Sequence, residues 1–264
     1  MRAVLGPSAL FAVPAASTLK ACDRDVDRQG SWPPTQIAPS RLVMTEAPRS
    51  VLASLMLLTL VTGIVDAASV LGLGHVFTAN MTGNVVFLGF ALAGKGTTTV
   101  AASLLALGSF AVGALAGGRV LKGLTAAAVK IAFSIEVATL MLAMLLGFVA
   151  ANGVGDVLVC LLAFAMGLRN AVVRKLAIPD MTTTVLTLTV TGLAADSSLA
   201  GGTNPRWQRR CLAILVMLVG AALGAALLSF GVAWVIAAAA ALEAIAVIVL
   251  IRNAAVFEAP ATAR

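Results

Sequence analysis

An aspartate inside a long apolar stretch is the first residue that could do chemistry. Asp66 lies in the run from 51 to 74 and shares a helical face with Thr59, Thr62 and Ser69, because the spacing i, i+3, i+7, i+10 stacks side chains on one side of a helix. A carboxylate that faces lipid costs roughly 3 kcal/mol, so this stripe should face protein or water. Two interpretations stay open. Asp66 lines a pathway as a proton-linked or cation-linked carboxylate, or it hydrogen-bonds the following turn and holds it in shape.

A polar cluster, FTANMTGNVVFLG at residues 77–89, follows this stretch. Its residues Asn80, Thr82, Gly83 and Asn84 suit a broken helix or a tight re-entrant turn, since Asn and Gly tolerate left-handed backbone. Non-helical backbone at membrane depth is tolerated only where protein or a water-filled cavity covers it. We therefore expect the chain to turn back inside a bundle, with a helix that starts at Asn84 and points its positive end into that space. A plain loop outside the membrane is the alternative.

A second polar cluster lies in the other half of the chain. Pro179 and Asp180 precede a threonine triplet at 182–184, and Pro with Asp or Thr caps is typical of a helix start. The threonines at 187, 189 and 191 alternate with apolar residues, a pattern that also fits an extended strand. A threonine-rich wall either binds a polar solute or packs helices together, and packing is the commoner case.

Other charged or polar residues lie within or beside the apolar runs. Arg169, Asn170 and Arg174 stand at the end of the fourth long run, where basic side chains either meet an anionic substrate or anchor the helix end at the membrane surface, the commoner role. Glu136 and Glu243 are lone carboxylates deep in apolar runs. The three cysteines show no ligand spacing, and no Walker A, dinucleotide, HExxH or GxSxG motif occurs, so we expect no metal or cofactor and disfavour an ATP-driven pump.

The composition places the chain in a lipid bilayer. Hydrophobic residues make up 60% and charged residues 11%, with a mean hydropathy of +1.03, whereas a soluble domain is about half apolar and about a quarter charged. A helix needs about 20 apolar residues to cross roughly 30 Å of hydrocarbon. Six runs meet this length, namely 51–74, 98–118, 127–151, 154–173, 210–230 and 232–252. Two shorter segments, about 80–95 and 181–196, are rich in Asn, Thr and Gly.

The basic residues indicate a topology. If the two short segments enter the membrane and return, all basic clusters fall on one side, which the positive-inside tendency assigns to the cytoplasm. These clusters are 41–49, 119–130, 169–175, 206–210 and Arg252. Six crossings with both termini cytoplasmic fit best, and eight crossings are the alternative. The net charge of +7 is therefore a topology signal, and no nucleic-acid partner is expected.

The chain divides into three regions. Residues 1–48 hold six of the nine prolines and lack sustained periodicity, so we interpret them as a disordered leader or, because Met44 offers another start, an over-extended gene start. A polytopic membrane domain spans 49–257, and 258–264 form a C-terminal tail.

The membrane domain contains an internal repeat. GIVDAASVLGL at 63–73 resembles GLRNAVVRKLA at 167–177, an offset of 104 residues. Gly113 and Gly117 match Gly220 and Gly224 at an offset of 107. The repeat halves are about 51–151 and 154–252. Because three crossings precede the second copy, the repeat should be inverted, as in many secondary transporters whose site lies between two interrupted segments.

The blocks VTGIVDAASVLGLGHVFTANMTGNVVFLG and GLRNAVVRKLAIPDMTTTVLTLTVTGLAAD resemble the two signature blocks of the YoaK-like family of bacterial membrane proteins, a domain family of unknown function. The resemblance runs from about Val51 to Arg252. The aspartate and TGN triplet typical of the first block match Asp66 and residues 82–84. The Gly-Leu-Gln-Asn-Ala run of the second block matches 167–171, with Arg169 where glutamine is usual. The resemblance implies an inner-membrane protein of about six spans and supplies no activity.

Together these patterns predict an all-α membrane protein with about six transmembrane helices, two short interrupted or re-entrant segments and an inverted internal repeat. The favoured function is a small-molecule carrier or permease-like protein in which Asp66 is the coupled carboxylate. Its predicted substrate-binding residues are Asp66, Asn80, Thr82, Asn84, Asn170, Asp180, Thr183 and Thr184. The alternatives are a membrane-embedded enzyme that acts on a lipid or isoprenoid, with Asp66 and Asp180 paired, and a non-transporting scaffold. The expected partners are the lipid bilayer and an unidentified small solute, and a homo-oligomer stays open.

Overall fold

The computed structural model describes residues 48–149, 153–176 and 186–253. The chain divides into two units, Met1–Arg41 and Leu42–Arg264, and all of the described residues belong to the second. In these ranges the chain is helical, with connecting turns and no strand. Residues 1–47 of the predicted leader, the tail 258–264, and Asp180, Thr183 and Thr184 lie outside the described residues.

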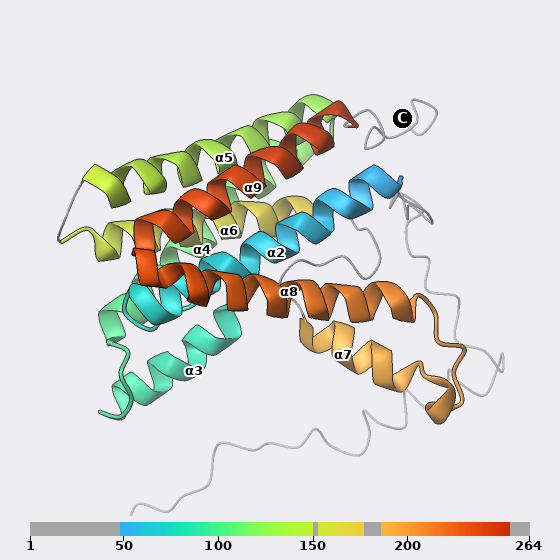
Figure 1. The fold of residues 1–264 in the computed structure, drawn as a ribbon, viewed down its shortest axis with the longest axis horizontal. Helices are drawn as coiled ribbons and strands as arrows, with labels where there is room; N and C mark the ends of the chain where they lie inside the picture. Colours follow the sequence, from blue (N-terminus) through green and yellow to red (C-terminus); the bar gives the residue numbers. More distant parts are fainter. Residues whose placement is uncertain (1–47, 150–152, 177–185, 254–264) are drawn as a thin grey trace, which may run out of the picture. The chain divides into compact units, whose positions relative to one another are not determined.

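Six of the helices are long and apolar enough to cross a membrane (Figure 1). They are α2 (Arg49–Gly72), α4 (Val100–Val120), α5 (Ala126–Val149), α6 (Gly155–Leu176), α8 (Trp207–Leu227) and α9 (Val232–Arg252). Their bounds follow the six predicted runs to within a few residues. The prediction of an all-α membrane protein with six spans is confirmed.

The two polar segments form short helices. They are α3 (Met81–Leu92) and α7 (Leu186–Ala195), which contact α4 and α8 respectively. At 1.5 Å per residue the 12 residues of α3 extend about 18 Å, too little to cross a bilayer. The alternating threonines at 187, 189 and 191 belong to α7, so the strand interpretation was wrong for the described residues.

Glycines set the distance between α2 and α8. A Cβ atom added to Gly63 would lie 2.5 Å from the carbonyl oxygen of Met217 on α8, and one added to Gly220 would lie 2.2 Å from the carbonyl oxygen of Leu60 on α2. No side chain fits at either position, so the two backbones approach closely, as small residues allow in membrane helix pairs.

The α4–α6 pair crosses in the same way. A Cβ atom on Gly167 would lie 2.1 Å from the carbonyl oxygen of Phe110, and one on Gly113 would lie 2.0 Å from that of Phe164. Each of these residues has its counterpart in the α2–α8 pair at the offset of 104 or 107 residues seen in the sequence. Equivalent residues of the two predicted halves thus make equivalent contacts, which supports the predicted repeat.

The remaining packing places α5 and α9 against each other, α9 against α2 and α5 against α6. Buried apolar side chains from α2, α5, α6 and α9 form the core, while leucines on the outer faces of α4 and α8, such as Leu115 and Leu218, are exposed. An apolar exterior around a packed interior is what a lipid solvent requires.

Candidate functional site

Asp66 connects α2 to the turn that follows it. Its Oδ1 atom accepts hydrogen bonds from the backbone N–H of Ala79 at 2.9 Å, from the backbone N–H of Thr78 at 3.1 Å and from the Thr78 hydroxyl at 3.3 Å. The carboxyl group is buried. These contacts agree with the interpretation in which Asp66 hydrogen-bonds the following turn and holds it in shape. The same side chain also lies beside a pocket.

Asn84 connects the turn to α3. Its Oδ1 accepts from the Phe77 N–H at 2.8 Å, and its Nδ2 donates to the Phe77 carbonyl at 2.6 Å, so the amide satisfies both backbone groups of one residue. Gly83 makes room for the Phe77 ring, because a Cβ there would lie 2.7 Å from it. The predicted helix start at Asn84 was wrong: α3 begins at Met81, since Asn84 turns its side chain back from within the first helical turn.

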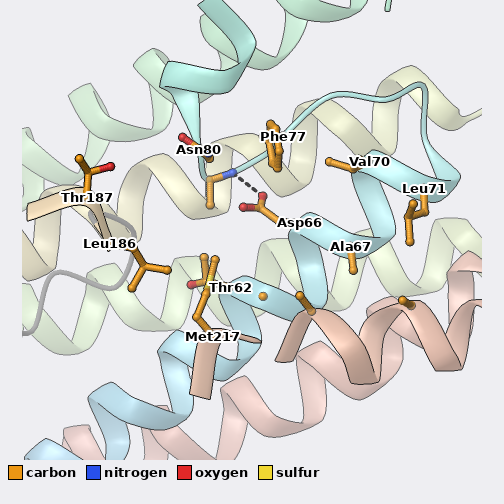
Figure 2. Close-up of a pocket in the computed structure, with 14 residues that line it drawn as sticks. Thr62, Asp66, Ala67, Val70, Leu71, Phe77, Asn80, Leu186, Thr187 and Met217 are labelled. Carbon is orange, nitrogen blue, oxygen red and sulfur yellow. Dashed lines mark hydrogen bonds between the residues drawn. The ribbon is translucent and has the colours of Figure 1, made fainter. Parts of the chain in front are cut away.

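The pocket has a volume of about 440 Å³ and lies where α2, the turn before α3, and the helices α7 and α8 meet (Figure 2). Its polar lining consists of Thr62, Asp66, Asn80 and Thr187. Figure 2 shows the Asp66 side chain extending from α2 toward the turn. The α8 wall is apolar and includes Met217, Ala221 and Ala225. The turn before α3 and the first described residues of α7 therefore border one cavity beside a carboxyl group.

Two of the predicted site residues, Asp66 and Asn80, line this pocket. Thr82 is exposed on α3 outside it, and Asn84 is buried against Phe77. Asn170 lies on α6, where its Nδ2 donates to the Met166 carbonyl at 2.8 Å. The other three, Asp180, Thr183 and Thr184, lie outside the described residues.

Two further polar lining residues were noted in the sequence without being assigned to the site. Thr62 was placed on the face of Asp66, and Thr187 belonged to the alternating threonines. The helical face that Thr62 shares with Asp66 was a sufficient sequence signal for assigning Thr62 to the site. Thr187 reaches the pocket only because α7 approaches α2 and α8, which a linear pattern does not reveal.

A fully buried ion cluster joins three helices next to this pocket. Arg169 on α6 donates from Nε to Glu136 Oε1 of α5 at 2.5 Å and from Nη2 to Glu243 Oε2 of α9. Its Nη1 donates to the Leu58 carbonyl at 2.9 Å and to the Thr62 hydroxyl at 3.0 Å, both on α2. We call Arg169, Glu136 and Glu243 the buried triad.

The triad corrects two sequence interpretations. Arg169 is not a surface anchor, because α6 continues for two further turns and the side chain has no exposed surface. Glu136 and Glu243 are not lone carboxylates, because both pair with Arg169. The signal was present in the repeat: the two glutamates are 107 residues apart, the offset that relates Gly113 to Gly220.

A second ion pair lies where α8 begins. Arg210 donates from Nη1 to Asp196 Oδ2 at 2.7 Å and to the Gly192 carbonyl at 2.5 Å, which ties α8 to the end of α7. Within residues 48–149, 153–176 and 186–253, no three His, Cys, Asp or Glu side chains are grouped so as to hold a metal ion.

Comparison with known proteins gives a family and no activity. A family model described as a protein of unknown function (DUF1275) matches residues 54–249. The chain is 37% identical over 188 residues to the UPF0700 transmembrane protein YoaK of Bacillus subtilis (strain 168), an alignment that covers 66% of this chain and 82% of the relative. No solved structure matches.

Proposed function

The chain belongs to the DUF1275 family of multi-pass membrane proteins of unknown function, the YoaK-like family that its two sequence blocks resemble, and we propose that it is a carrier for a small polar molecule that binds in the Asp66 pocket. One observation carries the proposal. The interrupted backbone before α3 and the first described residues of α7 border the same cavity as a carboxyl group. Non-helical backbone within a membrane protein is placed against protein or a cavity, and many transporters build their sites from such interrupted segments.

The pocket chemistry fits a small solute that has both polar and apolar parts. Threonine, asparagine and aspartate side chains line one wall, and alanines and a methionine of α8 line the other. The volume of about 440 Å³ falls within the range of ligand pockets, about 300 to 1,000 Å³. Asp66 supplies the charge that a cationic group or a coupled proton would meet.

We place the protein in the bacterial inner membrane with both termini in the cytoplasm. With six crossings, the basic residues at the start of α2 and at the ends of α4, α6 and α9 lie on one side, together with those at the start of α8. This distribution follows the positive-inside tendency.

Cysteine accessibility tests the proposal without knowledge of the substrate. On a background that lacks the three native cysteines, Ala221→Cys and Thr187→Cys should react with a membrane-impermeant thiol reagent in at least one of intact cells and inside-out vesicles. Leu223→Cys and Val190→Cys are the controls, since these exposed side chains lie on the same two helices outside the pocket and should stay unreactive in lipid.

The outcome separates a carrier from a scaffold. If both pocket cysteines are as unreactive as the controls from both sides, the cavity is closed to water and the carrier proposal is wrong. If they react, small molecules that slow the labelling become candidate solutes. Their effect should then be lost in Asp66→Asn, because the neutral amide removes the charge.

A further inference from the structure

The buried triad contains one more acidic group than basic group. Glu136, Glu243 and Arg169 each have no exposed surface, and both glutamates lie near the middle of their helices. The guanidinium uses four of its five N–H groups, two toward the carboxylates and two toward α2. If both glutamates were ionised, the cluster would carry one net negative charge in a fully buried site, where unpaired charge is strongly unfavourable.

Each glutamate also has an oxygen with no hydrogen-bond partner among the described residues. These atoms are Glu136 Oε2 and Glu243 Oε1, both fully buried. Both side chains pair with the one guanidinium group of Arg169, at Nε and at Nη2, which brings the two carboxyl groups together. Two ionised carboxylates cannot hydrogen-bond to each other, because neither oxygen carries a hydrogen. One added proton supplies a donor, so that both oxygens take part in a hydrogen bond.

The surroundings offer few other charges that could neutralise the pair. Arg169 faces it from α6, and Asp66 lies on α2 one helical turn beyond Thr62, with its Oδ1 occupied by the turn before α3. The helices α5 and α9 supply the pair itself. Neither α3 nor the described α7 contains a charged residue, and α4 and α8 carry theirs only near their cytoplasmic ends.

We propose that Glu136 and Glu243 form a proton-binding site that holds one shared proton between Glu136 Oε2 and Glu243 Oε1. With that proton the triad is neutral, one carboxyl group donates to the other, and both unpartnered oxygens are satisfied. A metal cation is a poor occupant, since hard cations take about six to eight oxygen ligands and only two free carboxylate oxygens are present beside a guanidinium.

Arg169 connects the proton site to the pocket lining. Arg169 Nη1 donates to the Thr62 hydroxyl, and Thr62 lines the pocket together with Asp66. Release of the proton would leave a net negative charge on the triad and alter how strongly Arg169 is held by the carboxylates. The proton is therefore the coupling ion of the carrier, a role that rests on the proposed function, whereas the proton site itself does not.

Infrared difference spectroscopy of the purified protein at neutral pH tests the site directly. A protonated carboxyl group gives a C=O band that shifts in heavy water, and the wild type should show one. Glu136→Gln and Glu243→Gln should each abolish it, because the remaining glutamate is then ionised and balanced by Arg169. Glutamine keeps the shape and can donate to the other carboxylate, so both variants should fold.

Two control variants assign the band to a particular carboxyl group. Asp66→Asn should leave the band in place, and a band that disappears only in this variant would assign the proton to Asp66 and overturn the proposal. Arg169→Gln removes the positive charge, so both glutamates should be protonated and the band should grow stronger. Absence of the band from the wild type would also overturn the proposal, and sodium binding that is lost in Glu136→Gln would then identify a metal ion as the occupant.

The two proposals fail in different ways. If the pocket cysteines do not react but the carboxyl band is present, the protein has a proton site and does not carry a solute through this pocket. An open pocket without the band leaves a carrier that is not coupled through the triad.

Discussion

Asp66 hydrogen-bonds the turn before α3 through one carboxyl oxygen. The structural role of this oxygen can therefore be tested separately from the charge of the side chain. Asparagine keeps an oxygen that can accept from the N–H groups of Thr78 and Ala79, whereas alanine has none. We expect Asp66→Ala to lower the free energy of unfolding by roughly 1–3 kcal/mol, the cost of unsatisfied buried groups, and Asp66→Asn to lower it less. Unfolding in mixed detergent measures both. Equal losses in the two variants would mean that the charge itself stabilises the turn.

Asn84 allows a second test within the same TGN triplet. Asn84→Ala leaves the partly buried N–H and C=O of Phe77 without their partner and should destabilise the protein by roughly 1–3 kcal/mol. Thr82→Ala, two residues away on an exposed face of α3, should change stability by no more than about 0.5 kcal/mol. Similar effects for both would show that the triplet does not connect the turn to α3 through the Asn84 amide.

Arg169 is a fully buried cation that pairs with two fully buried glutamates. Replacement by leucine removes the cation and the hydrogen-bond donors from a fully buried acidic pair, and breaking a buried ion pair costs roughly 3–5 kcal/mol. Arg174→Leu, on the exposed end of the same helix, is the matched control and should have little effect. Thermal unfolding followed in detergent compares them. A mild Arg169→Leu phenotype would mean that protonation of both glutamates offsets the loss of the cation and its hydrogen bonds.

The individual side chains were only partly predictable from the sequence. Asp66 was identified because a carboxylate in an apolar helix must face protein or water, and the turn-holding alternative described its contacts correctly. Arg169 was misassigned because a basic residue near a helix end usually points to the membrane surface. Its true partners are separated from it by 33 and 74 residues, a distance that local spacing does not bridge.

At the scale of the helices, glycine crossings determine how α2 meets α8 and α4 meets α6. Gly63→Ala and Gly167→Ala each place a Cβ within 2.5 Å of a carbonyl oxygen on the facing helix, so we expect losses of roughly 1–3 kcal/mol from overpacking. Gly108→Ala is the control on α4, with nothing within 4 Å of its added Cβ. It should be neutral or stabilise by up to about 1 kcal/mol, because alanine favours helix. Unfolding midpoints of the three variants provide the comparison.

The helices themselves followed from simple rules. Length and hydropathy located all six long helices, because each one must satisfy its backbone within a bilayer. The start of α3 was misplaced by three residues, since Asn84 looked like a cap and instead bonds back to Phe77. The approach of α7 to α2 depends on tertiary packing and had no signal in local sequence.

At the scale of the whole molecule, six crossings and eight crossings make opposite predictions for two exposed lysines. With six, Lys95 after α3 lies on the side of the membrane away from the cytoplasm, and Lys122 after α4 lies on the cytoplasmic side. With eight, the two positions exchange sides. On the cysteine-free background, Lys95→Cys should therefore react with an impermeant thiol reagent in intact cells, and Lys122→Cys should react only after permeabilisation. The reverse pattern would exclude the six-crossing topology.

The crossings at equivalent glycines have a consequence for how such a protein could arise. Glu136 and Glu243 occupy matching places in the two halves, but the position that matches Arg169 at the offset of 104 residues holds Val65. A dimer of two identical subunits would contribute either two arginines or none to the centre. When both halves belong to one polypeptide, the sequence of each half can change independently of the other. A single arginine can then lie between two equivalent glutamates, so the two-fold symmetry of the repeat is broken at the buried triad.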